Sequence, residues 1–246
     1  GAWGDSDYLR LAYQAFSSRF LKQGGGETEF DALWRAAERS ASERPECEIT
    51  LARLASRWGM PAEAERLWQR VVKHPPMRRE ALDSLFRIYR ASDDLRHLLS
   101  IARQLHESSP REPGLAATYA RFALLLEPNT EEAQRKAREA YDAAPEDVNC
   151  VVTYAFALYG LGRSAQGWEV LHKLPPERLL DPHVAVYAAL LLLDDNQAAP
   201  AAEYLTLARE GPLYPEEKKL LDEAIGKAAA LSAPAPVPPP LPAPSP

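Results

Sequence analysis

Apolar residues recur along the chain with helical spacing, and the same pattern returns about every 34 residues. The first stretch of each unit places apolar residues at i, i+3 and i+7, as in Leu82, Leu85 and Tyr89. This spacing puts them on one face of a helix, whereas a half-buried strand would alternate polar and apolar residues. A second stretch, with spacings of four and three, begins at Ala64 in one unit and at Ala133 in another. Each unit is therefore predicted to be a pair of amphipathic helices.

Residues suited to a sharp turn separate the two helices of each pair. Gly59, Gly162 and Asn196 suit the left-handed conformation that ends a helix, because they tolerate a positive φ. Asp93 and Pro128 occupy the same place in the remaining units. The five positions follow one another at intervals of 34, 35, 34 and 34 residues. Such a period indicates a tandem helical repeat.

The pattern resembles the tetratricopeptide repeat, a 34-residue unit that folds as helix, turn and helix. The family motif, small-Leu-Gly-Tyr…Ala…Phe…Ala…Pro, matches best in residues 45–76, 114–145 and 148–174. Phe86 and Arg121 depart from it, because the family has a small residue there. The resemblance implies an all-α fold, namely a right-handed α-solenoid of about six helix-turn-helix repeats with a C-terminal capping helix.

Four segments are expected along the chain. They are a degenerate N-terminal helix pair (1–44), five repeats (45–212), a capping helix (213–231) and a proline-rich tail (232–246). The capping helix carries Leu220, Leu221, Ala224 and Ile225 on one face. The tail suits polyproline II, and one hypothesis places residues 234–242 against an aromatic groove of the repeats.

Composition and charge exclude several classes of function. The chain has 29 Lys and Arg against 35 Asp and Glu, a net charge of -6, whereas general nucleic-acid binding needs a basic surface. The charge is uneven: residues 1–125 have a net charge of +2 and residues 126–246 have -8. No apolar run reaches the length that spans a bilayer. No catalytic or metal-binding motif occurs, so we expect no enzyme activity, no cofactor, no metal and no small-molecule substrate.

The two cysteines and the first residue leave the compartment open. Cys47 and Cys150 form no CxxC motif and are expected to remain unpaired, because they fall three repeat units apart. The chain starts at Gly1 rather than Met, so we expect a piece of a longer protein. A soluble domain in the cytoplasm, an exported one, or one tethered by an upstream membrane segment all agree with this.

The resemblance implies that the first helices of successive units line a concave groove. Its N-terminal half is expected to present Arg53, Arg57, Arg87 and Arg90. Its C-terminal half is expected to present Tyr119, Phe122, Phe156, Tyr159 and Leu190. The apolar half has two interpretations, an inner core or a peptide-binding site. The Lys and Asn clamp with which some members of the family bind a C-terminal carboxylate is absent, which disfavours binding of chaperone tails.

The sequence therefore predicts a non-enzymatic scaffold for protein–protein interaction that binds a peptide or protein segment in this groove. An alternative is a regulatory or targeting module of a larger protein, with or without a membrane anchor, whose active domain lies outside this chain. The expected partner is a protein or peptide, with no nucleic acid. Self-association through the proline-rich tail is a further alternative.

Overall fold

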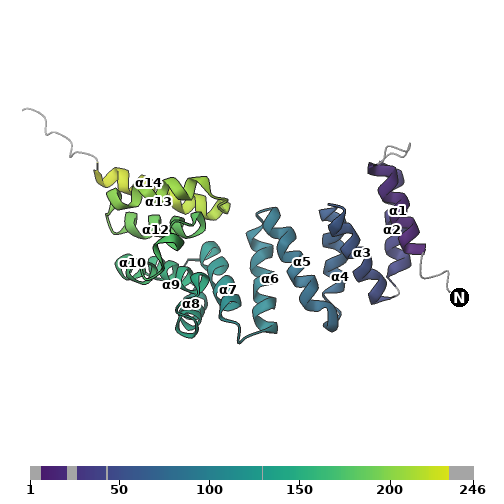
Figure 1. The fold of residues 1–246 in the computed structure, drawn as a ribbon, viewed down its shortest axis with the longest axis horizontal. Coiled ribbons are helices and arrows are strands. Elements are labelled where there is room, and N and C mark those ends of the chain that lie inside the picture. Colours follow the sequence, from purple (N-terminus) through teal and green to yellow (C-terminus); the bar gives the residue numbers. More distant parts are fainter. Residues whose placement is uncertain (1–6, 21–26, 43, 129, 233–246) are drawn as a thin grey trace, which may run out of the picture. The chain divides into compact units, whose positions relative to one another are not determined.

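The computed structural model describes residues 7–20, 27–42, 44–128 and 130–232, and these contain helices and no strand (Figure 1). The expected all-α repeat architecture is confirmed. The chain divides into two compact units, of which unit 1 ends at Ser108 and unit 2 begins at Ser109. The boundary falls between the second and third of the expected repeats.

Unit 1 consists of helices that each pack against the next one in the chain. They are α1 (Asp7–Phe20), α2 (Glu27–Ala41), α3 (Pro45–Arg57), α4 (Pro61–Val71), the 3-10 turn η2 (Pro75–Met77), α5 (Arg78–Ala91) and α6 (Leu95–Ser108). A partly buried ionic network joins three of them: Arg70 of α4 contacts Glu48 of α3 at 2.9 Å and Glu38 of α2 at 3.2 Å. The network fixes how these helices stack, because a buried carboxylate is stable only when it is paired.

Unit 2 stacks three helix pairs and adds a long terminal helix. Its helices are α7 (Pro113–Leu126), α8 (Glu131–Ala143), α9 (Val148–Gly160), α10 (Ser164–Leu171), α11 (Pro176–Leu179), α12 (Pro182–Asp194), α13 (Ala198–Glu210) and α14 (Pro215–Ser232). The first helices of the pairs pack on one another, α7 on α9 and α9 on α12. The sequence pattern did not predict the short helix α11. It starts at Pro176, and proline suits a first helical position because its missing N–H would have no partner there.

Left-handed turns end the first helices where the sequence predicts them. The φ angles are +67° at Gly59, +53° at Asp93, +67° at Gly162 and +60° at Asn196. After each turn residue, the next N–H donates to the carbonyl five positions earlier, at 3.0, 3.0, 2.9 and 2.8 Å respectively. These are Schellman motifs. The fifth position, Pro128, has no such turn, because the proline ring fixes a negative φ.

Small residues occupy an equivalent buried position in the second helices of four pairs. Ala64, Ala133 and Ala201 are fully buried at equivalent positions of α4, α8 and α13. The equivalent residue in α10 is Gly167, where a Cβ would lie 2.5 Å from Leu191 Cδ2 and 2.9 Å from the carbonyl oxygen of Ala155. No side chain fits at that position without moving the helices apart.

Candidate peptide-binding surfaces

The four arginines predicted for the groove lie on the first helices of unit 1. Arg53 and Arg57 belong to α3, and Arg87 and Arg90 belong to α5. All four side chains are exposed. They differ in what they contact: Arg53 is paired with a carboxylate of unit 1, and the other three are not.

Arg53 is engaged within unit 1. Its Nε and Nη2 atoms donate to the two carboxylate oxygens of Glu80, each at 2.6 Å. This bidentate hydrogen bond lowers the pKa of Glu80 and raises that of Arg53. Arg53 therefore links α3 to α5, and a ligand carboxylate would have to compete with Glu80 for it.

Arg57 and Arg87 border an open pocket of about 530 Å³. It lies between the end of α3, the start of α4 and the second half of α5. The lining residues are Ser56, Arg57, Gly59, Met60, Pro61, Ala64, Ser84, Arg87, Ile88 and Ala91. Arg87 Nη2 donates to Ser84 Oγ at 3.1 Å, which holds the guanidinium against the wall. The lining contains two cations and no carboxylate, so the pocket has a positive potential.

Among the described residues, Arg57, Arg87 and Arg90 make no ion pair with any carboxylate. The nearby acids on α5 are used by others: Glu80 pairs with Arg53 and Asp83 with Arg79. Arg87 is close enough to Glu80 to contribute to the lowered pKa of that carboxyl, but it is not paired with it. These arginines keep donors available for a carboxylate from another molecule.

The apolar half of the predicted groove is covered in unit 2. Tyr119 and Phe122 of α7, Phe156 of α9 and Leu190 of α12 are each 3% exposed or less, and Tyr159 is half-buried. Of the two interpretations of this apolar half, the burial of these side chains agrees with the inner core, and the peptide-binding site stays a prediction. The terminal segment contributes to this burial, because Tyr214 meets Phe122 and Leu220 of α14 lies opposite Phe156 and Tyr159.

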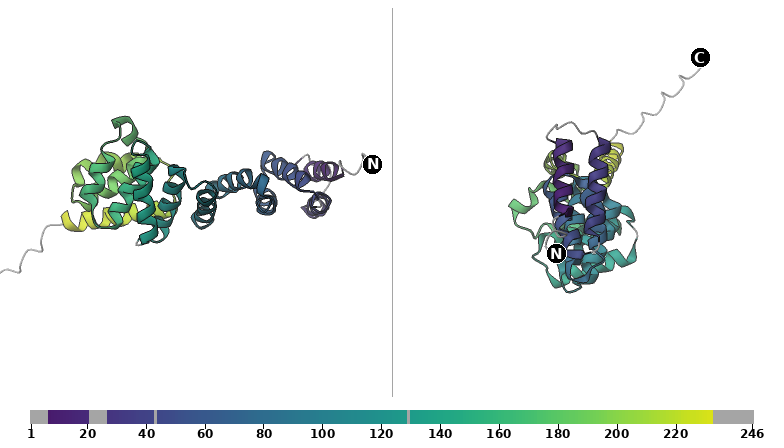
Figure 2. Two further views of the ribbon diagram at one scale, coloured as in Figure 1. Left: turned by 90° about the horizontal axis from the view of Figure 1, so that it is seen from below. Right: turned by 90° about the vertical axis from the view of Figure 1, so that its right-hand side faces the viewer.

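We call the side of unit 2 lined by α7, α9 and α12 the inner face. Helix α14 packs chiefly against α12 and also reaches α7, two pairs away. Figure 2 (left) shows α14, in yellow, lying along one side of the green helices of unit 2. The ring of Tyr214, just before α14, meets Phe122 edge-on at a centroid distance of 5.7 Å. The terminal helix is thus seated across the inner face rather than only closing the end of the array.

A polar contact anchors the first turn of α14. The hydroxyl of Tyr187, on α12, donates to Glu217 Oε1 at 2.5 Å, and the Tyr214 N–H donates to Glu217 Oε2 at 3.0 Å. Glu217 is 4% exposed, so its carboxylate depends on these donors. Burial, reinforced by the charge of Glu217, raises the pKa of Tyr187 well above its usual value.

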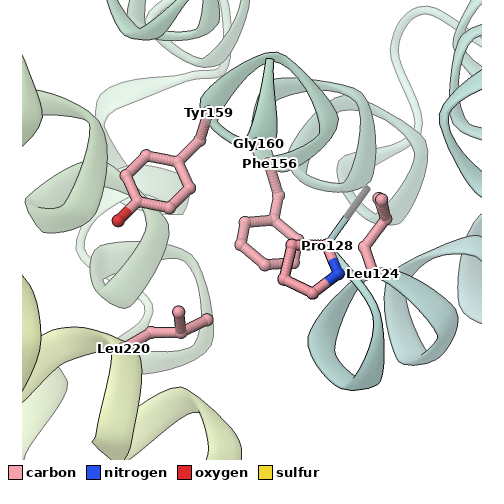
Figure 3. Close-up of a pocket in the computed structure, with 6 residues that line it drawn as sticks. All are labelled: Leu124, Pro128, Phe156, Tyr159, Gly160 and Leu220. Atoms are coloured by element: carbon pink, nitrogen blue, oxygen red, sulfur yellow. The ribbon is translucent and has the colours of Figure 1, made fainter. Parts of the chain in front are cut away.

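The fit of α14 to the inner face is incomplete. A cavity of about 20 Å³ lies between Leu220 of α14 and the residues opposite it, Leu124, Pro128, Phe156, Tyr159 and Gly160. Figure 3 shows the rings of Phe156 and Tyr159 extending from their helix toward the side on which Leu220 lies. The lining is almost entirely apolar, so the cavity offers no set of polar partners for a water molecule.

Sequence reasoning identified the buried side of the terminal helix but missed its polar anchor. Leu221 and Ala224 are buried, and Leu220 and Ile225 are half-buried, as the pattern predicts. Glu217 follows Tyr214 by three residues, the spacing at which a glutamate caps a helix start. That signal indicates a helix terminus and gives no information about Tyr187. The hypothesis for residues 234–242 of the tail falls outside the described residues.

Three further findings concern metal binding, the cysteines and membrane spans in the described part of the chain. It holds no group of three or more His, Cys, Asp or Glu side chains arranged to bind a metal. Cys47 and Cys150 are both free and buried. Within the same residues, no helix combines the length and hydropathy that crossing a membrane requires.

Comparisons with known proteins show similarity in structure alone. No protein-family model matches the sequence, and no curated protein does. Among solved structures, a tetratricopeptide repeat protein from Parabacteroides merdae superposes with a TM-score of 0.54 at 15% identity, over 93% of this chain and 94% of that one. A TPR protein of Thermus thermophilus gives 0.45 at 19% identity over 76% and 99%, and yeast Tom70 gives 0.44 at 11% over 91% and 47%. With the Parabacteroides likeness and the left-handed turns at 34-residue steps, the chain has the fold of a tetratricopeptide-repeat protein.

Proposed function

We propose that the protein is a non-enzymatic interaction module that binds an acidic segment of a partner protein on the first helices of unit 1. The observation that supports this proposal is the open pocket between Arg57 and Arg87, which has two cations and no carboxylate in its lining. Guanidinium groups bind carboxylates through paired hydrogen bonds, so a segment rich in Asp or Glu complements the pocket. The proposal is the same whether the chain acts alone or as a module of a longer protein.

The inner face of unit 2 supports this choice of site by contrast. Tyr119, Phe122 and Phe156 are already buried there, whereas Arg57, Arg87 and Arg90 of unit 1 are exposed in the part of the chain that the structure describes. Arg90 lies one helical turn after Arg87 on α5 and extends the positive surface beyond the pocket. An extended acidic peptide of several residues would therefore contact all three cations.

The test is the affinity of a fluorescein-labelled peptide of alternating Glu and Ser, measured by fluorescence anisotropy. We expect Arg57→Gln and Arg87→Gln each to weaken binding by about tenfold, because a hydrogen bond to a charged group contributes about 1.5–3 kcal/mol. The matched control is Arg96→Gln, an exposed arginine on the second helix α6, which should bind as the unaltered chain does. Added salt should weaken binding, because the contacts are exposed charges.

Two results would overturn the proposal. One is equal affinity for a peptide of alternating Lys and Ser, since that would remove charge as the basis of recognition. The other is a loss of affinity in Arg96→Gln as large as in Arg87→Gln, which would mean that the pocket contributes nothing specific. Circular dichroism of each variant would establish that the helices remain folded.

A further inference from the structure

We propose that the inner face of unit 2 is a second binding site, for an amphipathic helix of a partner protein, and that α14 is the internal occupant which that helix replaces. This inference does not rest on the acidic-peptide site of unit 1. It rests on three features of unit 2. The helices of the inner face are apolar and must be shielded from water, α14 shields them but leaves a cavity, and the hydrogen-bond donors beneath α14 require an acceptor on the helix bound there.

The inner face needs a cover because its helices are apolar on nearly every side. In α12, all ten residues from Val184 to Leu193 are buried. A helix that is apolar all round is stable in water only when it is enclosed on every side. Its neighbours α9 and α13 enclose α12 within the stack, and α14 encloses it on the inner side. Phe122 meets Tyr214 just before α14, and Phe156 lies across a cavity from Leu220 of α14, so removing this segment would uncover both rings.

The present cover buries few of its own side chains. Of residues 215–229 of α14, only Glu217, Leu221 and Ala224 are buried. The helix is also poor in large apolar residues toward its end, where Gly226 and Ala229 are exposed. The cavity beside Leu220 leaves part of the aromatic face unfilled. A helix with a larger residue at that position would contact Phe156 and Tyr159 more completely.

The polar donors beneath α14 specify the ligand further. Tyr187 is buried, and its hydroxyl finds its acceptor on α14, in Glu217. Arg121 of α7 lies close enough to lower the pKa of Tyr187, and its Nε is buried with no hydrogen-bond partner among the described residues. Tyr187 thus donates to the first turn of α14, whereas the buried Nε of Arg121 has no acceptor among the described residues. A carboxylate in the first turn of a ligand helix would be complementary to these donors.

The ligand class follows from the register of α14. A partner helix should carry an acid in its first turn, a large apolar residue three positions later, Leu at the fourth position and a small residue at the seventh. These are the places of Glu217, Leu220, Leu221 and Ala224. Because α14 is tethered, its effective concentration is in the millimolar range, and a partner helix binds the unaltered chain more weakly than the vacant face.

The first experiment uses the full chain and a fluorescein-labelled peptide that copies residues 213–231 with Leu220→Phe. We expect the chain variant Leu221→Asp, which weakens the internal helix, to bind this peptide at least tenfold more tightly than the unaltered chain. The matched control is Ala229→Asp, on the exposed side of α14, which should bind as the unaltered chain does. A peptide that also carries Glu217→Gln should bind at least tenfold more weakly. Equal affinity of the Leu221→Asp and unaltered chains would overturn the proposal.

The second experiment needs no variant of the chain and therefore decides the matter if Leu221→Asp unfolds unit 2. Hydrogen exchange followed by mass spectrometry should show α14 exchanging faster than α12 in the unaltered chain, and faster still when excess peptide is present. The Leu220→Phe change distinguishes the peptide from α14 by mass. Protection of α14 equal to that of α12, unchanged by the peptide, would show that α14 is a fixed part of the core and overturn the proposal. Crosslinks joining α14 of one copy to α12 of another would also overturn it, since the occupant would then be a second chain.

Discussion

Replacing Gly167 with alanine should destabilise unit 2, although alanine is the better helix former. Gly167 is a buried residue of α10. The added Cβ would lie 2.5 Å from Leu191 Cδ2 and 2.9 Å from the carbonyl oxygen of Ala155. Leu191 is fully buried, so its side chain cannot turn out into solvent, and the carbonyl belongs to the backbone of α9. Helices α9 and α10 would therefore have to separate.

The expected magnitude is the difference of two opposing effects. Alanine in a helix interior is favoured over glycine by about 1 kcal/mol. Adding a methyl group to a well-packed contact costs about 1–3 kcal/mol. Two contacts under 3.0 Å, one of them with backbone, place this site in the upper part of that range. We expect a net loss of about 1–2 kcal/mol in the free energy of unfolding of unit 2.

The assay is urea unfolding of the full chain, followed by far-UV circular dichroism and by tryptophan fluorescence, to which Trp168 of α10 contributes. The matched control is Gly226→Ala in α14, where a Cβ would meet nothing within 4 Å. That substitution should stabilise the helix by about 0.5–1 kcal/mol. An unfolding midpoint for Gly167→Ala at or above that of the unaltered chain would refute the packing argument.

Four further outcomes follow from the structure. Ala133→Leu should lower the free energy of unfolding by about 1–3 kcal/mol in urea titrations, because Ala133 is fully buried, whereas Ala229→Leu on an exposed site should not. Asp93→Gly should raise the unfolding midpoint, because it removes a left-handed strain of about 1 kcal/mol at a φ of +53°. Cys150, fully buried and with its pKa raised to about 12, should resist iodoacetamide in the native protein and react in urea, as mass spectrometry would show. The pKa of Glu80 is lowered in the folded state, so its carboxylate stabilises the fold above its unfolded pKa, and this stabilisation is lost as the pH falls through its folded pKa. Thermal melts should therefore show that acid lowers the stability of Glu80→Gln less than that of the unaltered chain. The difference should be under about 1 kcal/mol, because the pair is exposed.

The turns could be predicted from the sequence because their cause is local. Gly59, Gly162 and Asn196 are residues that accept a positive φ, and the hydrogen bonds that close each turn join residues of the same helix end. Asp93 has the same conformation, although aspartate tolerates a positive φ less well than glycine. The repeat interval, and not the residue type, identified this turn. Pro128 broke the pattern for an equally local reason, since its ring cannot take that conformation.

The location of α14 could not be predicted, because its cause is not local. Hydrophobic periodicity assigned the buried side of this helix but does not say which helices cover it. Docking on α7 and α12 depends on contacts such as Tyr187 with Glu217, which lie thirty residues apart in the chain. For the same reason the sequence placed Phe122 and Phe156 on a groove but could not show that the chain itself covers them.

The arginines of unit 1 illustrate the same limit. All four were placed on the first helices correctly, because position on a helix follows from the period. Which of them is paired depends on the stacking of α3 on α5, which brings Glu80 to Arg53 across 27 residues of sequence. Only after that pair is known do Arg57, Arg87 and Arg90 stand out as the predicted groove arginines that have no carboxylate partner among the described residues.

The Schellman turns also determine where insertions and deletions can accumulate. Three residues connect the helices wherever such a turn is present, as between α3 and α4, α5 and α6, α9 and α10, and α12 and α13. Their hydrogen bonds run between main-chain atoms at a fixed separation, so one extra residue would break them, whereas side chains there are free to diverge. The connections between pairs vary in length, and the longest, from α10 to α12, accommodates α11. Divergence of this kind preserves the interval between turns while changing side chains nearly everywhere else, and it is how a chain can keep this fold at 15% identity.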